Sequence, residues 1–160
     1  MKVALVLSVV FLAACATAPP NELERLNAFE PVPDLSPLEV VQIQIDAFAA
    51  NDTDDRGIDI AFRFASPANR EVTGPADRFG EMMRGPAYAA MLNPVRVAYG
   101  NVRITGRDAQ VPVRITTVDG RDIIYLFVLA KQSDDPYADC WMTEAVQILG
   151  TIEEPAPQTI

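Results

Sequence analysis

The spacing of apolar residues changes at Asn93-Pro94, and this change constrains the fold more than any other feature of the sequence. Before it, apolar residues recur every three or four positions, as they do on one face of an α-helix. After it, they alternate with polar residues, as in strands that bury one face. Helices followed by an antiparallel meander predict an α+β domain with helices packed on one face of a sheet.

The helical half contains clear start signals. Ser36-Pro37-Leu38-Glu39 combines a capping box with Pro at the first helical position, so a helix should begin here. Asn51-Asp52 ends the apolar periodicity of this first helix. Shorter helical segments are predicted at 58–65, 67–72, 75–84 and 86–92.

The sheet half is organised around a predicted hairpin at Asp119-Gly120, a dipeptide that suits the positive φ angles of a two-residue turn. Such a turn would pair Val113 with Leu126, and Pro112 should interrupt the pairing because it has no N–H to donate. The face of the return strand that carries Tyr125 and its neighbours would then be uncovered. A second copy, the chain's own tails or an envelope protein would have to cover it.

The predicted architecture resembles a known fold. A long first helix, short helices and then a curved antiparallel sheet is the order of elements in the cone shared by nuclear transport factor two and ketosteroid isomerase. That fold carries both enzymes and binding modules, so the resemblance implies no particular function.

The N-terminus is typical of an exported lipoprotein. Met1-Lys2 precedes an apolar run at 3–12, which as a helix would cover about 15 Å, half of a bilayer core of about 30 Å. Leu12-Ala13-Ala14-Cys15 resembles the bacterial lipobox, in which the cysteine is acylated and becomes the first residue after cleavage. Ala16, in place of Asp, implies sorting to the outer membrane, facing the periplasm. An ordinary cleavage site beside a chance cysteine is the alternative.

The sequence therefore divides into four parts. These are a signal peptide at 1–14, a lipidated Cys15 with a Pro-bearing tether at 15–35, a single α+β domain at 36–149 and a flexible tail at 150–160.

Composition excludes several functions. The formal net charge of −9 disfavours nucleic acid, whose affinity comes mainly from Lys and Arg neutralising phosphates. The chain has no histidine, which rules out Ser-His and Cys-His pairs and imidazole metal sites, so we expect no metal and no other cofactor. If Cys15 carries lipid, Cys140 has no intramolecular partner, and we predict a buried, inert thiol there.

The middle of the chain is similar to the domain of unknown function 4864 family, and the similarity extends over most of 36–149. It implies a domain extent and no chemistry. The residues that carry it are Phe62 to Arg70, Thr73-Gly74-Pro75, Arg78-Phe79, Gly85-Pro86-Ala87-Tyr88, Tyr125 to Leu129, Pro136-Tyr137 and Cys140-Trp141-Met142-Thr143.

Aromatic residues and one acid are the candidates for a pocket. Concave sites are mostly apolar with a few polar groups, although aromatics at helical spacing more often belong to an ordinary core. Asp46 could act as a base if it faced a cavity, but its position on the first helix also fits solvent exposure. The candidate pocket residues are Asp46, Phe64, Tyr88, Tyr125 and Trp141.

Two functions remain open. The first is a non-catalytic, membrane-anchored domain that binds an apolar small molecule or a protein. The second is a histidine-free isomerase or dehydratase that uses Asp46 with Tyr88 or Tyr125. A third, weaker hypothesis is that the protein is an accessory subunit of an outer-membrane complex. The absence of histidine and of a closely spaced second acid favours the first.

Replacing Cys15 with Ala should abolish lipid attachment, because both acylation and cleavage depend on the cysteine sulfur. Cells fed a clickable fatty acid should label the unaltered protein and leave the variant unlabelled and uncleaved or soluble. Mature, unlabelled protein from the unaltered sequence would contradict the lipoprotein assignment.

Overall fold

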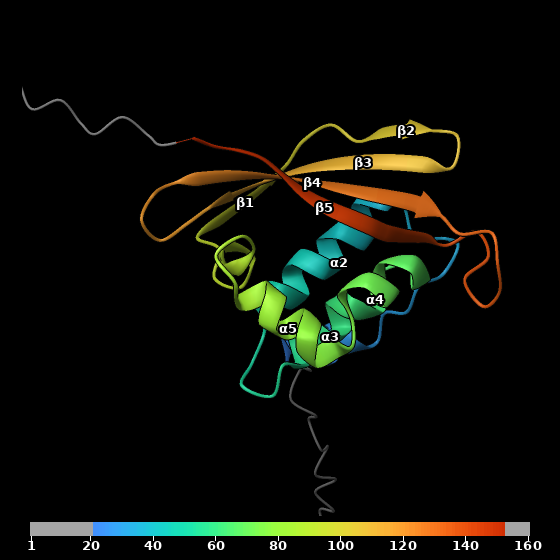
Figure 1. Cartoon of the computed structure of the whole chain (residues 1–160), viewed down its shortest axis with the longest axis horizontal. Coiled ribbons are helices and arrows are strands. Elements are labelled where there is room, and N and C mark those ends of the chain that lie inside the picture. Colours follow the sequence, from blue (N-terminus) through green and yellow to red (C-terminus); the bar gives the residue numbers. More distant parts are fainter. Residues whose placement is uncertain (1–20, 153–160) are drawn as a thin grey trace, which may run out of the picture.

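The computed structural model describes residues 21–152, which form a layer of helices against a sheet (Figure 1). The helices of this range are α1 (Glu22–Asn27), α2 (Pro37–Ala49), α3 (Arg56–Arg63), α4 (Pro67–Thr73) and α5 (Ala76–Arg84), followed by the 3-10 turn η1 (Ala89–Met91). The strands are β1 (Arg96–Tyr99), β2 (Arg103–Thr105), β3 (Asp108–Thr116), β4 (Asp122–Lys131) and β5 (Trp141–Ile152).

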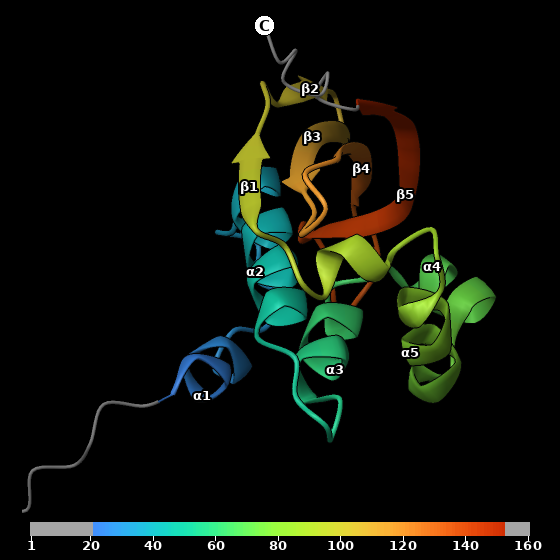
Figure 2. The same ribbon diagram turned by 90° about the vertical axis from the view of Figure 1, so that its left-hand side faces the viewer.

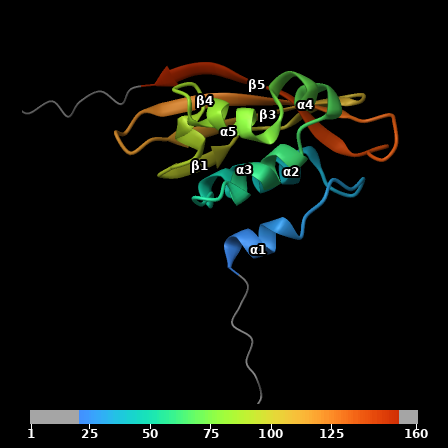
Figure 3. The ribbon, with the colours of Figure 1, turned by 60° about the horizontal axis from the view of Figure 1, so that its bottom comes forward.

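The sheet is an open antiparallel meander. Its order is β1-β3-β4-β5, and β2 pairs with the same edge of β3 as β1 does. The helices cover one face of the sheet, and α1 lies on the side of α2 and α3 that faces away from it (Figure 3). The predicted α+β class, with helices packed on an antiparallel sheet, is confirmed.

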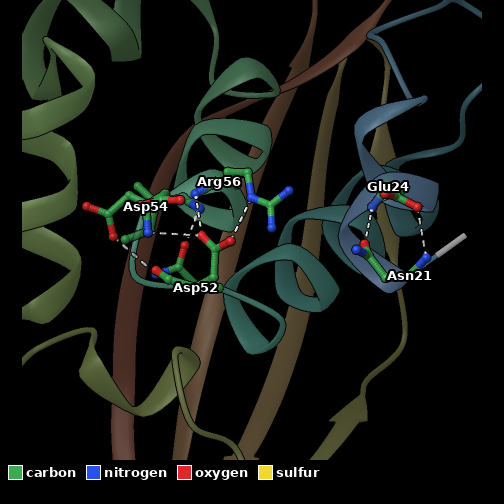
Figure 4. Close-up of polar contacts among 8 residues, drawn as sticks. Asn21, Glu24, Asp52, Asp54 and Arg56 are labelled. Carbon is green, nitrogen blue, oxygen red and sulfur yellow. Dashed lines mark hydrogen bonds and ion pairs between the residues drawn. The ribbon is translucent and has the colours of Figure 1, made fainter.

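Side chains accept from main-chain N–H groups at the starts of α2 and α3. The predicted capping box is present: Ser36 N donates to Glu39 Oε2 at 2.8 Å, and Glu39 N donates to Ser36 Oγ at 3.3 Å. Before α3, the carboxylate of Asp52 accepts from the main-chain N–H groups of Asp54 and Arg56 and from the Arg56 side chain (Figure 4). The chain is thereby turned from α2 into α3.

Part of the segment predicted as a tether, 15–35, is folded onto the domain. Its helix α1 begins at a second capping box, made by Asn21 and Glu24 (Figure 4). Leu26 is only 1% exposed. Arg63 of α3 donates to Glu30 at 2.8 Å and to the main-chain carbonyl oxygens of Asn27, at the end of α1, and of Phe29. Few apolar residues occur in this segment, but two of them are enough to dock one short helix.

The hairpin between β3 and β4 forms, but the predicted register is wrong by one residue. The turn has a three-residue loop at 118–120, closed by Thr117 N donating to Arg121 O. Within this loop only Gly120 has a positive φ, of 82°, whereas a two-residue turn of the predicted type needs two such residues. Val113 therefore pairs with Tyr125 and not with Leu126.

This slip exchanges the two faces of β4, because successive side chains of a strand point to opposite sides. The side chains of Tyr125, Phe127 and Leu129 are 0%, 1% and 0% exposed beneath the helices. The expectation that this face needs an external cover is wrong. Partly exposed Ile124 and Leu126 occupy the open face instead.

Pro112 interrupts a strand pairing, but on the opposite side from the one predicted. It pairs regularly with Leu126 of β4. The nitrogen and the carbonyl oxygen of Pro112 both point to the other edge of β3, away from β4. The carbonyl oxygen accepts from Gly100 N at 2.8 Å. Because Pro112 has no N–H to donate there, the edge strand breaks between Tyr99 and Arg103 into β1 and β2.

The link between α3 and α4 is bonded to the edge strand β5 at Thr143. Thr143 N donates to Phe64 O and Ser66 N donates to Thr143 O, both at 2.9 Å, which makes a short parallel bridge. The Thr143 hydroxyl donates to Gln44 Oε1 at 2.7 Å, and Gln44 Nε2 donates to Ala61 O at 3.0 Å. These buried polar groups join α2, α3 and β5.

Replacing Thr143 with Val should lower the free energy of unfolding by about 1–3 kcal/mol, because the buried Gln44 Oε1 loses its donor while the side-chain shape is kept. Thr151→Val is the matched control on the same strand, where the side chain is exposed and the change should stay within about 0.5 kcal/mol. Denaturant titration measures both. Equal effects of the two substitutions would show that the buried network contributes nothing.

Candidate functional site

A pocket of about 410 Å³ lies between the helices α4 and α5 and the strand β5. Figure 2 shows these two helices beside the strongly curved β5. The volume falls in the range of small-molecule sites, about 300–1,000 Å³. Its large apolar lining residues are Phe48, Phe79, Met82, Met83, Met91 and Phe127.

Small residues and flexible ones shape this pocket. Ala65, Ala68 and Ala145 form parts of its wall where longer side chains would fill the space. Three of the chain's five methionines line it. Methionine is unbranched and polarisable, so it adapts to differently shaped ligands. The lining thus suits a flexible or irregular apolar molecule.

Most polar groups of the pocket are bonded to its own wall. Asn69 Nδ2 donates to Thr143 O at 2.9 Å, and the Thr73 hydroxyl donates to Asn69 O at 2.8 Å. The Tyr88 hydroxyl donates to Val146 O at 3.3 Å. The Asn69 and Tyr88 bonds tie α4 and the loop before η1 to β5, so they hold the walls in place, and the Thr73 bond lies within α4.

Glu144 reaches the pocket because β5 is bulged there. Thr143 and Ala145 pair with consecutive residues of β4, which leaves Glu144 without a partner in the ladder. A bulge changes the direction of side chains that would otherwise alternate between faces, and residues 143–146 all line the pocket. Glu144 Oε1 accepts from Gln132 Nε2 at 3.0 Å.

Of the five candidate pocket residues, only Tyr88 lines this pocket. Phe64 and Tyr125 are fully buried and Trp141 is 8% exposed, so all three belong to the core. Asp46 is exposed on α2, because its neighbours on that helix already point into the core.

Asp46 and Tyr88 therefore do not form an acid and hydroxyl pair in one cavity. Asp46 instead lines a shallow depression between α1 and α2 with Arg25. Partial burial beside α1 raises the pKa of Asp46, the Glu22 carboxylate raises it further, and Arg25 opposes both. The geometry of the predicted catalytic pair is absent among the residues described.

Sequence reasoning missed the residues that give the pocket its character. The helical spacing of Met82 and Met83 from Phe79 was available as a signal, but it cannot separate a pocket wall from a core. No signal in the sequence pointed to Glu144, since a bulge in β5 depends on its pairing with β4.

The prediction that Cys140 is a buried thiol is confirmed, because its side chain is 2% exposed. Burial raises the pKa of this thiol, and the nearby Asp139 carboxylate raises it further.

Within residues 21–152, no three His, Cys, Asp or Glu side chains are grouped so that they could hold a metal ion. No helix in the same range is long and apolar enough to cross a membrane.

These features define an α+β domain with an apolar, methionine-rich pocket at one edge of its sheet. The family model described as Domain of unknown function (DUF4864) matches residues 35–156, so the chain belongs to that family. The resemblance seen in the sequence is thereby confirmed. No curated protein and no solved structure matched the chain.

The stability of the fold should fall as the pH rises from about 10 through about 12, the range in which Tyr125 titrates. Burial, with the nearby Tyr88, raises the pKa of Tyr125 from 10.0 to about 12, so the fold favours the neutral phenol. Below about pH 10 the Tyr125 phenol is neutral in both the folded and the unfolded protein, so it does not change the stability. Between about pH 10 and 12 it ionises in the unfolded protein but not in the fold, which lowers the free energy of unfolding. Denaturant midpoints measured at about pH 9 and pH 11.5 should show the loss.

Tyr125→Phe should reduce this alkaline loss, while costing about 0.5–1.5 kcal/mol at neutral pH because the hydroxyl no longer donates to Ala87 O. Burial and the charge of Asp46 also raise the pKa of Tyr99 to about 12, so part of the loss should remain. Tyr137→Phe serves as the control. If Tyr125→Phe loses as much stability at high pH as the unaltered protein, the effect does not come from Tyr125.

Proposed function

We propose that this protein is a non-catalytic, membrane-anchored domain of the bacterial envelope that binds an apolar small molecule between α4, α5 and β5. The observation that carries the proposal is the pocket itself, which has a suitable size and a lining of aromatic and methionine side chains. Its hydroxyl and amide groups are mainly engaged in holding the walls.

The alternative, a histidine-free isomerase or dehydratase, receives less support from this arrangement. It needs a base beside a tyrosine hydroxyl, and Asp46 lies outside the pocket that Tyr88 lines. The Tyr125 hydroxyl is bonded to the main chain at Ala87 O, at 2.9 Å, and its side chain is buried. Neither tyrosine is paired with Asp46 as that reaction would require.

The location of the protein is also a proposal. The signal at 1–14 and the lipidated Cys15 lie outside the described residues, and they are inferred from composition and from the lipobox pattern. Two or three acyl chains on one cysteine would anchor the domain stably, whereas a single chain binds only marginally. We place the protein at the periplasmic face of the outer membrane. The acidic composition, which disfavours binding to nucleic acid, agrees with this location.

We also propose that the fold is related to the cone of nuclear transport factor two and ketosteroid isomerase. The order of elements and the two irregularities in the pairing of β5 with β4 support this relation, because bulges bend a sheet. A homodimer or an envelope partner protein stays a prediction; the open face carries Ile124, Leu126 and Leu149 for such a contact.

A neutral fluorescent apolar probe, N-phenyl-1-naphthylamine, tests the pocket. The purified protein should bind it saturably with one site. Ala145→Trp fills the pocket and should raise the Kd by roughly tenfold or more, since the probe loses its space. Val95→Trp, at a position that is 62% exposed and outside the pocket, should leave the Kd unchanged.

Circular dichroism and thermal unfolding show whether each variant is folded. Absence of saturable binding to the unaltered protein, or equal binding to a folded Ala145→Trp variant, would reject the proposed function.

A further inference from the structure

Glu144 is the only formally charged side chain among the residues that line the apolar pocket. No Lys or Arg within residues 21–152 forms an ion pair with it. Gln132 donates to Oε1, and no other donor to this carboxylate is found in the same range. The pocket wall thus includes a glutamate whose charge no ion pair among the described residues balances.

The bulge in β5 makes this placement specific. A regular strand would direct Glu144 to the side opposite Thr143 and Ala145, but all three line the pocket. The backbone irregularity therefore brings a charge to a wall that is otherwise apolar. Its partner Gln132 donates to Oε1, and no donor among the described residues is bonded to Oε2.

The charge determines which ligands the site favours. An anionic ligand would bring two like charges together, and a wholly apolar ligand would remove water from the carboxylate without replacing its hydrogen bonds. An ammonium group would do neither. Aromatic rings also attract ammonium groups through their faces, and Phe48, Phe79, Tyr88 and Phe127 line the same pocket.

We infer that the pocket selects an apolar molecule that carries an ammonium group, with Glu144 as the counter-charge. This inference rests on the proposed binding function and adds the class of ligand. The apolar part of the ligand lies against the methionines and aromatic rings, and its ammonium group lies at the Glu144 carboxylate.

Displacement of bound N-phenyl-1-naphthylamine tests the inference with three probes of equal chain length. These are decylammonium, decanol and decanoate, each used below its micelle concentration or, for decanol, below its solubility limit. The ammonium probe should displace the dye from the full-length protein at a concentration at least about tenfold lower than either of the others. Glu144→Gln, which keeps an oxygen to accept from Gln132, should abolish this preference.

Asp77→Asn is the matched control, because it changes the net charge equally at an exposed residue of α5 that does not line the pocket. It should retain the preference. Equal loss in both variants would assign the effect to the overall negative charge and overturn the inference. Equal displacement by the three probes in the unaltered protein would also overturn it, although the pocket would still bind apolar molecules. Failure of the dye itself to bind would instead reject the proposed function.

Discussion

The pairing of Thr143 with the link between α3 and α4 is the interaction on which the rest of the structure depends. At Thr143 the helical layer is hydrogen-bonded to the edge of the sheet through two main-chain bonds of 2.9 Å and a buried side-chain bond to Gln44. An edge strand otherwise presents unpaired main-chain groups. Here the link between the helices satisfies some of them, and the same bonds place α4 beside β5.

The pocket is a consequence of that attachment. Because α4 is held at Thr143, its apolar residues face β5 across a space that the small side chains of Ala68 and Ala145 do not fill. The bulge at Glu144 then adds a carboxylate to a wall made of aromatic and methionine side chains. The bonds that hold α4, the space of the pocket and the Glu144 carboxylate thus all involve one short stretch of β5. The binding proposal and the proposed ligand class therefore depend on the same strand.

Local chemistry made parts of this fold predictable. The capping box at Ser36 needs only neighbouring residues, so the start of α2 could be located from the sequence. The hairpin at Asp119-Gly120 was also recognisable, but its register was not, because loop length depends on how many residues adopt a positive φ. The site was the least predictable part: of the five candidates, Tyr88 lines the pocket, whereas Asp46 is exposed because its neighbours on α2 fill the core.

The sequence by itself determined that helices precede strands, the α+β class and the family, since these follow from periodicity, caps and residues close together in the chain. Only the tertiary structure decided which face of β4 is buried, that α1 docks onto the domain and that Glu144 enters the pocket. Each of these depends on contacts between distant segments. A shift of one residue in a strand reverses the direction of every side chain, so alternation alone cannot assign them.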